Sequence, residues 1–183
     1  MPDWDDREII EGAKSHGKEE LSFNKLVLKY QERLYWHIRK IVVSHEDADD
    51  VLQNTFVKVW KSLPEFRSES GLFTWLYRIA TNEALTLLKQ KKRRAFAPMG
   101  GDLEQKLSQQ LQADPWFDGD EAQLRFQEAI LKLPEKQRIV FNMKYFDQVK
   151  YEEMSEILDT SVGALKASYH HAMKKLEQYL TDD

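Results

Sequence analysis

The sequence contains no cysteine among its 183 residues, and only 7 glycines and 5 prolines. The lack of cysteine excludes disulfide bonds, thiolate metal sites and a cysteine nucleophile. The scarcity of helix-breaking residues, and the rarity of Val or Ile alternating with polar residues, favour an all-helical protein. No apolar run approaches the ~20 residues that a membrane-spanning helix needs. The acidic start also lacks the apolar segment of a secretory signal, so we expect a cytoplasmic protein without membrane insertion.

Positive charge is scarce overall but concentrated locally. The net charge is -4 and the sequence pI is near 5.8. Residues 81–100 nevertheless contain five basic side chains and one acidic one, whereas residues 101–120 contain one basic and five acidic side chains. Nucleic acid responds to the local field, so the net charge does not exclude DNA binding.

The first part of the chain predicts three helices. Residues 1–20 are acidic and are expected to be loosely ordered. Apolar residues then recur at three- and four-residue spacings after Ser22, which we interpret as the N-cap of a helix. A second helix is expected to begin after Ser44, in a capping box, and to end near Leu63. Residues 72–94 predict a long third helix with a basic end.

The last part of the chain predicts four helices. We expect them over residues 121–133, 134–146, 151–158 and 162–180. A short helix, a three-residue turn and a longer helix make a helix-turn-helix.

The fold class is therefore all-α, with two small helical domains joined by a flexible linker. The C-terminal domain is expected to be a four-helix, winged-helix-like unit with the helix-turn-helix. We place an acidic extension at residues 1–20, an N-terminal domain at 21–97, an acidic linker at 98–120 with a short helix over 103–111, and a C-terminal domain at 121–183.

Three patterns favour nucleic-acid binding, and each has a plainer interpretation. Lys166, Ala167, His170 and Lys174 share one side of the last helix, as a major-groove reading helix requires, although a solvated helical hairpin fits equally well. The basic run KQKKRR can neutralise phosphates, or simply complement a helix dipole. The aromatic residues ahead of it can stack on unpaired bases, but helix aromatics usually belong to a core; they are Phe66, Phe73, Trp75 and Tyr77.

Enzymatic patterns are absent, so we expect neither catalysis nor a cofactor or metal ion. Asp49 and Asp50 are adjacent, which on a helix separates them by about 100° and prevents them from forming an acid/base pair. His170 and His171 fail as joint metal ligands for the same reason. The sequence also has no glycine-rich phosphate loop and no nucleophile elbow.

Taken in order, the blocks resemble an extracytoplasmic-function sigma factor, a member of the smallest class of bacterial RNA polymerase initiation factors. The resemblance covers roughly residues 21–97 and 121–180. The matching segments are DADDVLQNTFVKVWKSLPEFR, FTWLYRIATNEAL with its basic tail, and LPEKQRIVFNMKYFDQVKYEEMSEIL.

The resemblance implies three binding surfaces. A helix face would dock on the clamp helices of the polymerase's largest subunit, through Asp50, Gln53, Asn54 and Lys58. A loop and helix would read the minus-ten promoter element and hold a flipped base, through Arg67, Ser68, Glu69, Ser70, Phe73, Trp75, Arg78, Asn82, Thr86, Lys89, Lys92 and Arg93. The last helix would read the minus-thirty-five element, through Ser161, Gly163, Ala164, Lys166, Ala167, His170, His171 and Lys174.

The resemblance also implies partners: core RNA polymerase, promoter DNA and an anti-sigma factor that wedges against both modules. One departure from the family pattern is Asp159, which stands where the turn usually has glycine; Asp tolerates left-handed geometry better than most residues. Two other hypotheses remain. A stand-alone helix-turn-helix regulator would bind an operator without polymerase, and a helical interaction protein would show no promoter dependence.

Overall fold

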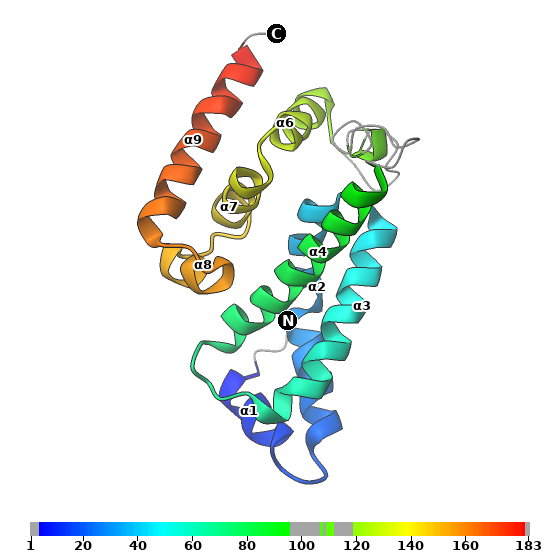
Figure 1. Ribbon diagram of the computed structural model, residues 1–183. Coiled ribbons are helices and arrows are strands. Elements are labelled where there is room, and N and C mark those ends of the chain that lie inside the picture. The colour runs from blue at the N-terminus through cyan, green and yellow to red at the C-terminus, as the bar shows by residue number, and fades with distance from the viewer. Residues whose placement is uncertain (1–3, 96–106, 108, 112–118, 182–183) are drawn as a thin grey trace.

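The computed structural model describes residues 4–95, 107, 109–111 and 119–181, and these residues are helical wherever they form regular structure (Figure 1). The all-α expectation is therefore confirmed. Within this part of the chain, no helix is both long and apolar enough to cross a membrane. The elements, in order, are α1 (Asp6–Ala13), α2 (Glu19–Val42), α3 (His45–Ser62), the 3-10 turn η1 (Leu63–Glu65), α4 (Leu72–Ala95), α6 (Glu121–Leu131), α7 (Glu135–Tyr145), α8 (Tyr151–Leu158) and α9 (Val162–Thr181).

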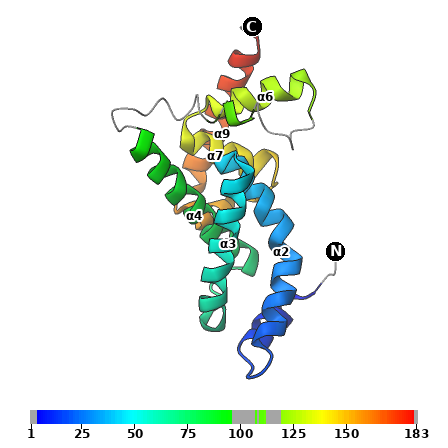
Figure 2. The same cartoon turned by 90° about the vertical axis from the view of Figure 1, so that its right-hand side faces the viewer.

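The helices α2, α3 and α4 form the bundle of what we call the N-terminal module, residues 4–95 (Figure 2). Ser44 caps α3, as the sequence predicts, by accepting a hydrogen bond from the Asp47 backbone N–H at 3.4 Å. α4 buries a side chain at every fourth residue, and two of these are alanines, which let α4 approach its neighbours closely; they are Leu76, Ala80, Ala84 and Leu88.

The start of the chain differs from the expectation of a loosely ordered segment. Residues Asp6–Ala13 form α1, which is capped by Asp5 and buries Ile9 and Ala13 against the bundle. The helix α2 begins at Glu19, so Ser22 lies buried within it and is not its N-cap. Gly12 explains the close approach: a Cβ there would lie 2.1 Å from the Ser22 Oγ.

The helices α6 to α9 form the C-terminal module, residues 121–181. Its helix-turn-helix follows the sequence prediction closely, with α8 at Tyr151–Leu158 and α9 at Val162–Thr181. Asp159 sits between them in the left-handed region, at φ 49° and ψ 49°. A cluster centred on Phe141, which includes Ala172 and Leu176 of α9, forms the module's own core.

The two modules are packed together. One hydrophobic cluster includes Leu76 and Tyr77 of α4 together with Met154 and Ile157 of α8. α4 therefore lies between α3 on one side and α8 on the other (Figure 1). Most of the segment expected to link the modules, including Trp116 and Phe117, falls outside the described residues. Of the short helix expected there, Leu107 and Leu111 are described and are buried beside Val43 and Leu131.

Candidate DNA and polymerase interfaces

The outer side of α3 carries the residues expected to dock on polymerase. Val51, Thr55 and Val59 are buried on the inner side of this helix. Asp50, Gln53, Asn54 and Lys58 are all exposed, which is consistent with a docking face. Lys58 also forms an ion pair with Glu83 of α4. This contact fixes the position of one end of the polar face relative to the neighbouring helix.

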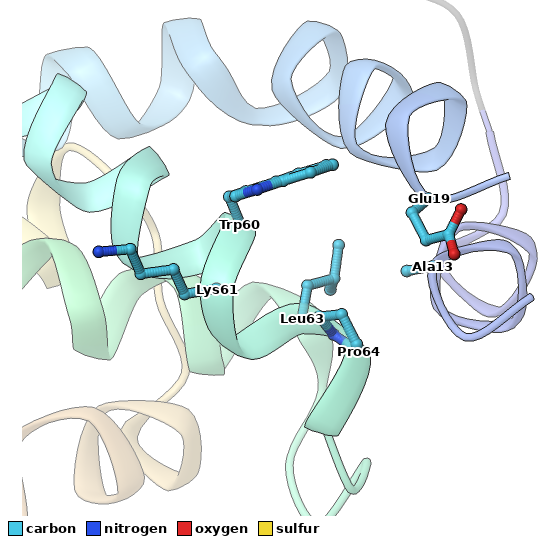
Figure 3. A pocket seen from close by; sticks show the side chains of 6 residues that line it. All are labelled: Ala13, Glu19, Trp60, Lys61, Leu63 and Pro64. Atoms are coloured by element: carbon cyan, nitrogen blue, oxygen red, sulfur yellow. The ribbon is translucent and has the colours of Figure 1, made fainter. Parts of the chain in front are cut away.

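The same helix exposes two apolar side chains that the sequence analysis did not single out. Val57 is 52% exposed, and Trp60, which the helical periodicity assigns to the buried side, is 44% exposed. The Trp60 ring packs edge-on against Phe23 of α2, with the ring centroids 5.0 Å apart. Figure 3 shows Trp60 and Leu63 facing Ala13 across a cavity of about 250 Å³. In the sequence, the sign of this surface was a pair of apolar residues three positions apart on an otherwise polar helix face.

The loop before α4 borders a larger cavity. Arg67, Ser68 and Glu69 are exposed, and Ser68 adopts a left-handed backbone conformation with φ 57°. Such strain in a non-glycine residue is uncommon and clusters at functional sites. The cavity measures about 660 Å³, which lies within the ~300–1,000 Å³ typical of small-molecule sites. It is lined by Ser68–Leu72 of the loop and α4, by Asp6, Arg7, Ile10 and Glu11 of α1, by Lys14 just after α1, and by Glu156 of α8.

The aromatic residues around the start of α4 pack largely on one another. Phe66 is buried, and its ring lies 4.8 Å from that of Trp75. Phe73 lies 4.2 Å from the buried Tyr77 ring, and the Arg33 guanidinium covers Phe73 at 4.2 Å. Burial, aided by the nearby Asp147 carboxylate, raises the pKa of Tyr77. Phe73 and Trp75 are half-buried, so only part of each ring is open to a base.

The C-terminal half of α4 presents an open basic surface. Asn82, Thr86 and Lys89 are exposed along one side, and Lys92 and Arg93 continue the surface to the end of the helix. Lys91 differs, because its amine forms an ion pair with Asp47 of α3. The predicted phosphate-binding run is therefore divided between a free basic end and one lysine with a structural partner.

The helix α9 exposes the side that the sequence analysis assigned to DNA reading. Leu165, Ala172 and Leu176 are buried on its inner side. Ser161 caps the helix by accepting a hydrogen bond from the Ala164 backbone N–H at 3.3 Å. The exposed side gathers small and basic residues, as close approach to a groove requires; they are Gly163, Ala164, Lys166, Ala167, His170, His171 and Lys174.

The N-terminal half of α4 is in a different situation, because the C-terminal module contacts it. The Arg78 guanidinium donates to the main-chain carbonyl of Glu156 in α8, with its Nε at 2.9 Å from the oxygen. Arg78 is one of the residues expected to contact the minus-ten element. The structure therefore places Arg78 in contact with the C-terminal module as well as with solvent.

Two protein-family models match this chain, one on each module. Sigma-70 region 2 matches residues 26–94, and Sigma-70 region 4 matches residues 123–176. Among curated proteins, the ECF RNA polymerase sigma factor SigW of Bacillus subtilis is 30% identical over 168 residues, covering 88% of this chain and 90% of that protein. The RNA polymerase sigma-H factor of Pseudomonas aeruginosa is 28% identical over 185 residues, covering 96% and 93%.

Two solved structures share the fold. CnrH, solved in complex with the cytosolic domain of CnrY, superposes with a TM-score of 0.70 at 23% identity, covering 97% of this chain and 98% of that one. The sigma factor RpoE of Bartonella quintana, solved in complex with the anti-sigma factor NepR, gives a TM-score of 0.68 at 21% identity, covering 88% and 98%.

Proposed function

Because this chain belongs to the extracytoplasmic-function sigma factors, which direct promoter-specific transcription by RNA polymerase, we propose how its residues divide that work. The N-terminal module docks on core RNA polymerase and reads the minus-ten element, and the C-terminal module reads the minus-thirty-five element. The observation that carries this proposal has two parts. Each family model matches one module, and each module has an exposed helix face whose residues suit the proposed role. The chain acts as an initiation factor and supplies no catalytic group of its own.

The proposed polymerase-docking surface is the exposed polar face of α3. Asp50, Gln53 and Asn54 offer one carboxylate and two amides on consecutive turns of a helix that is held rigidly by its buried side. A partner helix can be recognised by such a face through hydrogen bonds and charge complementarity. We add Val57 and Trp60 to this surface as apolar anchors, because exposed aromatic residues dominate many interfaces.

The proposed minus-ten surface combines the loop Arg67–Gly71 with the exposed side of α4. The loop borders the 660 Å³ cavity that we assign to an extruded base. Asn82 and Thr86 would face the neighbouring bases, and Lys89, Lys92 and Arg93 would neutralise phosphates. Phe73 and Trp75 are half-buried, so they offer only the edges of their rings beside this surface. Neither offers an open ring face on which a base could stack.

The proposed minus-thirty-five surface is the exposed side of α9. Lys166, Ala167, His170 and His171 lie over its first turns, where a reading helix contacts base edges, with Lys174 one turn further on. An anti-sigma factor is the further proposed partner, and the RpoE neighbour was solved with one. Its target would be surfaces that both modules contribute.

The first experiment is co-elution of the full chain with core RNA polymerase. We expect the wild type to co-elute and the Asp50→Arg, Gln53→Ala double variant to lose binding, because charge reversal on the docking face replaces attraction by repulsion. The matched control is Glu177→Arg, Gln178→Ala, which makes the same changes at exposed positions of α9.

Three results would discriminate between the hypotheses. Loss of core binding in the α3 variant alone supports the docking face. Equal loss in the α9 control would contradict it. A wild-type protein that ignores core polymerase but binds specific duplex DNA would favour the stand-alone regulator.

A further inference from the structure

One acidic side chain of the C-terminal module is buried against the N-terminal module. Asp147, in the turn between α7 and α8, directs its carboxylate at α2. One carboxylate oxygen accepts a hydrogen bond from His37 Nδ1 at 2.9 Å, and the other accepts from Lys40 Nζ at 2.5 Å. The Asp147 side chain is only 6% exposed, and that of His37 only 1%. One nearly buried anion thus bridges the two modules, beside the shared hydrophobic cluster and the hydrogen bond from Arg78 to Glu156.

The basic side chains that contact Asp147 lie in the N-terminal module, and two of them, His37 and Lys40, contact its carboxylate. Arg33, His37 and Lys40 follow one another at four- and three-residue spacings, so they share one side of α2. The Arg33 guanidinium completes the set by donating to the main-chain carbonyl of Asp147 at 3.3 Å. Three basic residues therefore converge on one point of the C-terminal module.

The His37 ring is held from both sides. Its Nδ1 contacts the Asp147 carboxylate at 2.9 Å, and its Nε2 lies 2.9 Å from the Thr81 hydroxyl of α4, which also donates to the main-chain carbonyl of Tyr77 at 2.7 Å. Groups of both modules therefore fix the orientation of this ring.

Removal of Asp147 from this position would leave the cations without their buried anion. An uncompensated charge in so enclosed a place is costly. The site also adjoins the promoter-facing helix, because Thr81 of α4 belongs to it and Arg78 lies one turn earlier on the same helix. A phosphate group presents the same acceptors as a carboxylate and pairs strongly with Arg and Lys.

We propose that Arg33, His37 and Lys40 form a binding site for a phosphate group of the promoter strand, and that Asp147 occupies this site as a substitute anion while the modules are packed together. The inference rests on the proposed function and deepens it. DNA and the C-terminal module compete for one site, and the separation that admits the phosphate also releases Arg78 from Glu156.

The titration of Asp147 supports an anion-selective site. Burial by itself would raise the pKa of this carboxyl group. The hydrogen bond from His37, and the charges of His37 and Lys40, outweigh burial and lower that pKa below its ordinary value. The site therefore favours a charged occupant over a neutral one.

The test measures binding of labelled single-stranded oligo(dT) to the full chain over a range of salt concentrations. Asp147→Asn preserves the shape of the side chain and removes its charge, so we expect several-fold tighter binding than for the wild type. In that background, Lys40→Gln should weaken binding several-fold and reduce the slope of log K against log salt by about 0.7, the value for one phosphate on a single strand.

The matched control is Lys25→Gln in the same Asp147→Asn background. Lys25 lies on α2 as well, and its side chain is 23% exposed against 22% for Lys40, but it pairs with Glu8 away from the site. We expect Lys25→Gln to leave the salt slope unchanged. Equal slopes for the Lys40 and Lys25 variants, or no gain from Asp147→Asn, would overturn the proposal.

A second measurement needs no change to the site. The sequence has no cysteine, so Glu65→Cys and Gln178→Cys, both at exposed positions, allow one dye on each module. We expect energy transfer to fall as oligo(dT) saturates the chain, whereas constant transfer at saturation would contradict the competition. Core-polymerase co-elution is measured in parallel: its failure in the wild type would overturn the proposed function and leave the oligo(dT) result intact.

Discussion

The two candidate DNA-reading helices differ in charge and in how much of each is covered. α4 ends in the basic run KQKKRR, and the start of the helix is packed against α8. Residues 160–180, which contain all but the last residue of α9, hold three lysines and no arginine, and the candidate reading side of α9 is exposed. The more basic of the two helices is thus the one that the other module partly covers.

Under the proposed function, this difference bears on how an acidic chain with a weakly charged reading helix would act at promoters. The packed chain leaves the basic end of α4 open but covers the start of that helix, so only part of the proposed minus-ten surface faces DNA. Separation of the modules would add the covered part, which includes Arg78. Once polymerase holds both modules at a fixed spacing, two modest contacts act together with an affinity that neither has alone.

The largest expected effect concerns whether the modules unfold as one unit. Leu176→Ala removes a buried side chain of the C-terminal core and should cost about 2–5 kcal/mol of the free energy of unfolding. All five tryptophans precede the C-terminal module, so tryptophan fluorescence reports on the rest of the chain, whereas circular dichroism reports all helices. Because one hydrophobic cluster spans both modules, we expect urea unfolding of this variant to shift by both signals.

The control for that prediction is Leu76→Ala, in the cluster that the modules share. It should shift both signals by a similar amount. A Leu176→Ala variant that shifts only the dichroism would show that the modules unfold independently. The contacts that cover α4 would then contribute only a small part of the free energy of unfolding.

A second prediction concerns pH. The pKa of Asp147 is lowered from 3.8 when the chain is folded, so its charge stabilises the packed arrangement fully above that ordinary value. The contribution is lost as the pH falls through the lower folded pKa. We expect the difference in unfolding free energy between wild type and Asp147→Asn to be constant above about pH 5 and to shrink on acidification. A constant difference down to about pH 2.5 would contradict the role of the charge.

The third prediction compares two basic residues of α4. Lys92→Ala should weaken oligo(dT) binding and reduce the salt slope by about 0.7, because the side chain is exposed and open to phosphate. Arg78→Ala should change the salt slope less in the wild type, because the guanidinium is hydrogen-bonded to the main-chain carbonyl of Glu156. Placing both variants in the Asp147→Asn background sharpens the comparison, since Arg78 should then match Lys92. If Arg78→Ala reduced the salt slope in the wild type as much as Lys92→Ala does, α8 would not shield Arg78 from DNA.

The helices were predictable where local signals agree with packing. α8 matches its predicted bounds, and α4 its predicted start, because each has one apolar side and clear breaks around it. α1 was not predictable in this way: it is short and acidic, and its order depends on Gly12 fitting against Ser22 in another helix. Helical periodicity alone places Trp60 on the buried side of α3, yet it is 44% exposed, because periodicity gives a direction around the helix but not where the neighbouring helices end.

The exposure of the candidate residues was predictable one residue at a time, but the arrangement around Asp147 was not. The exposed side of α9 and the basic end of α4 follow from helical periodicity. Asp147 gave no signal, because an acidic residue in a polar turn is ordinarily solvated. Its partners Arg33 and His37 lie more than a hundred residues earlier in the chain, so only the packing of two modules makes them a site.

The smallest expected effect concerns two left-handed residues, one in each module. Asp159 ends α8 at φ 49°, and Ser68 lies in the candidate base-binding loop at φ 57°. Glycine adopts this region without strain but has more freedom to lose on folding. We therefore expect Asp159→Gly to raise the free energy of unfolding by less than about 1 kcal/mol, because the residue closes a helix end within the packed structure. Ser68→Gly, in an exposed loop, should leave stability unchanged and instead weaken promoter binding by holoenzyme, since a floppier loop must be ordered around the base. Thermal unfolding and promoter titration of the two variants separate these effects, and a stability gain at Ser68 equal to that at Asp159 would remove the distinction between a structural turn and a functional one.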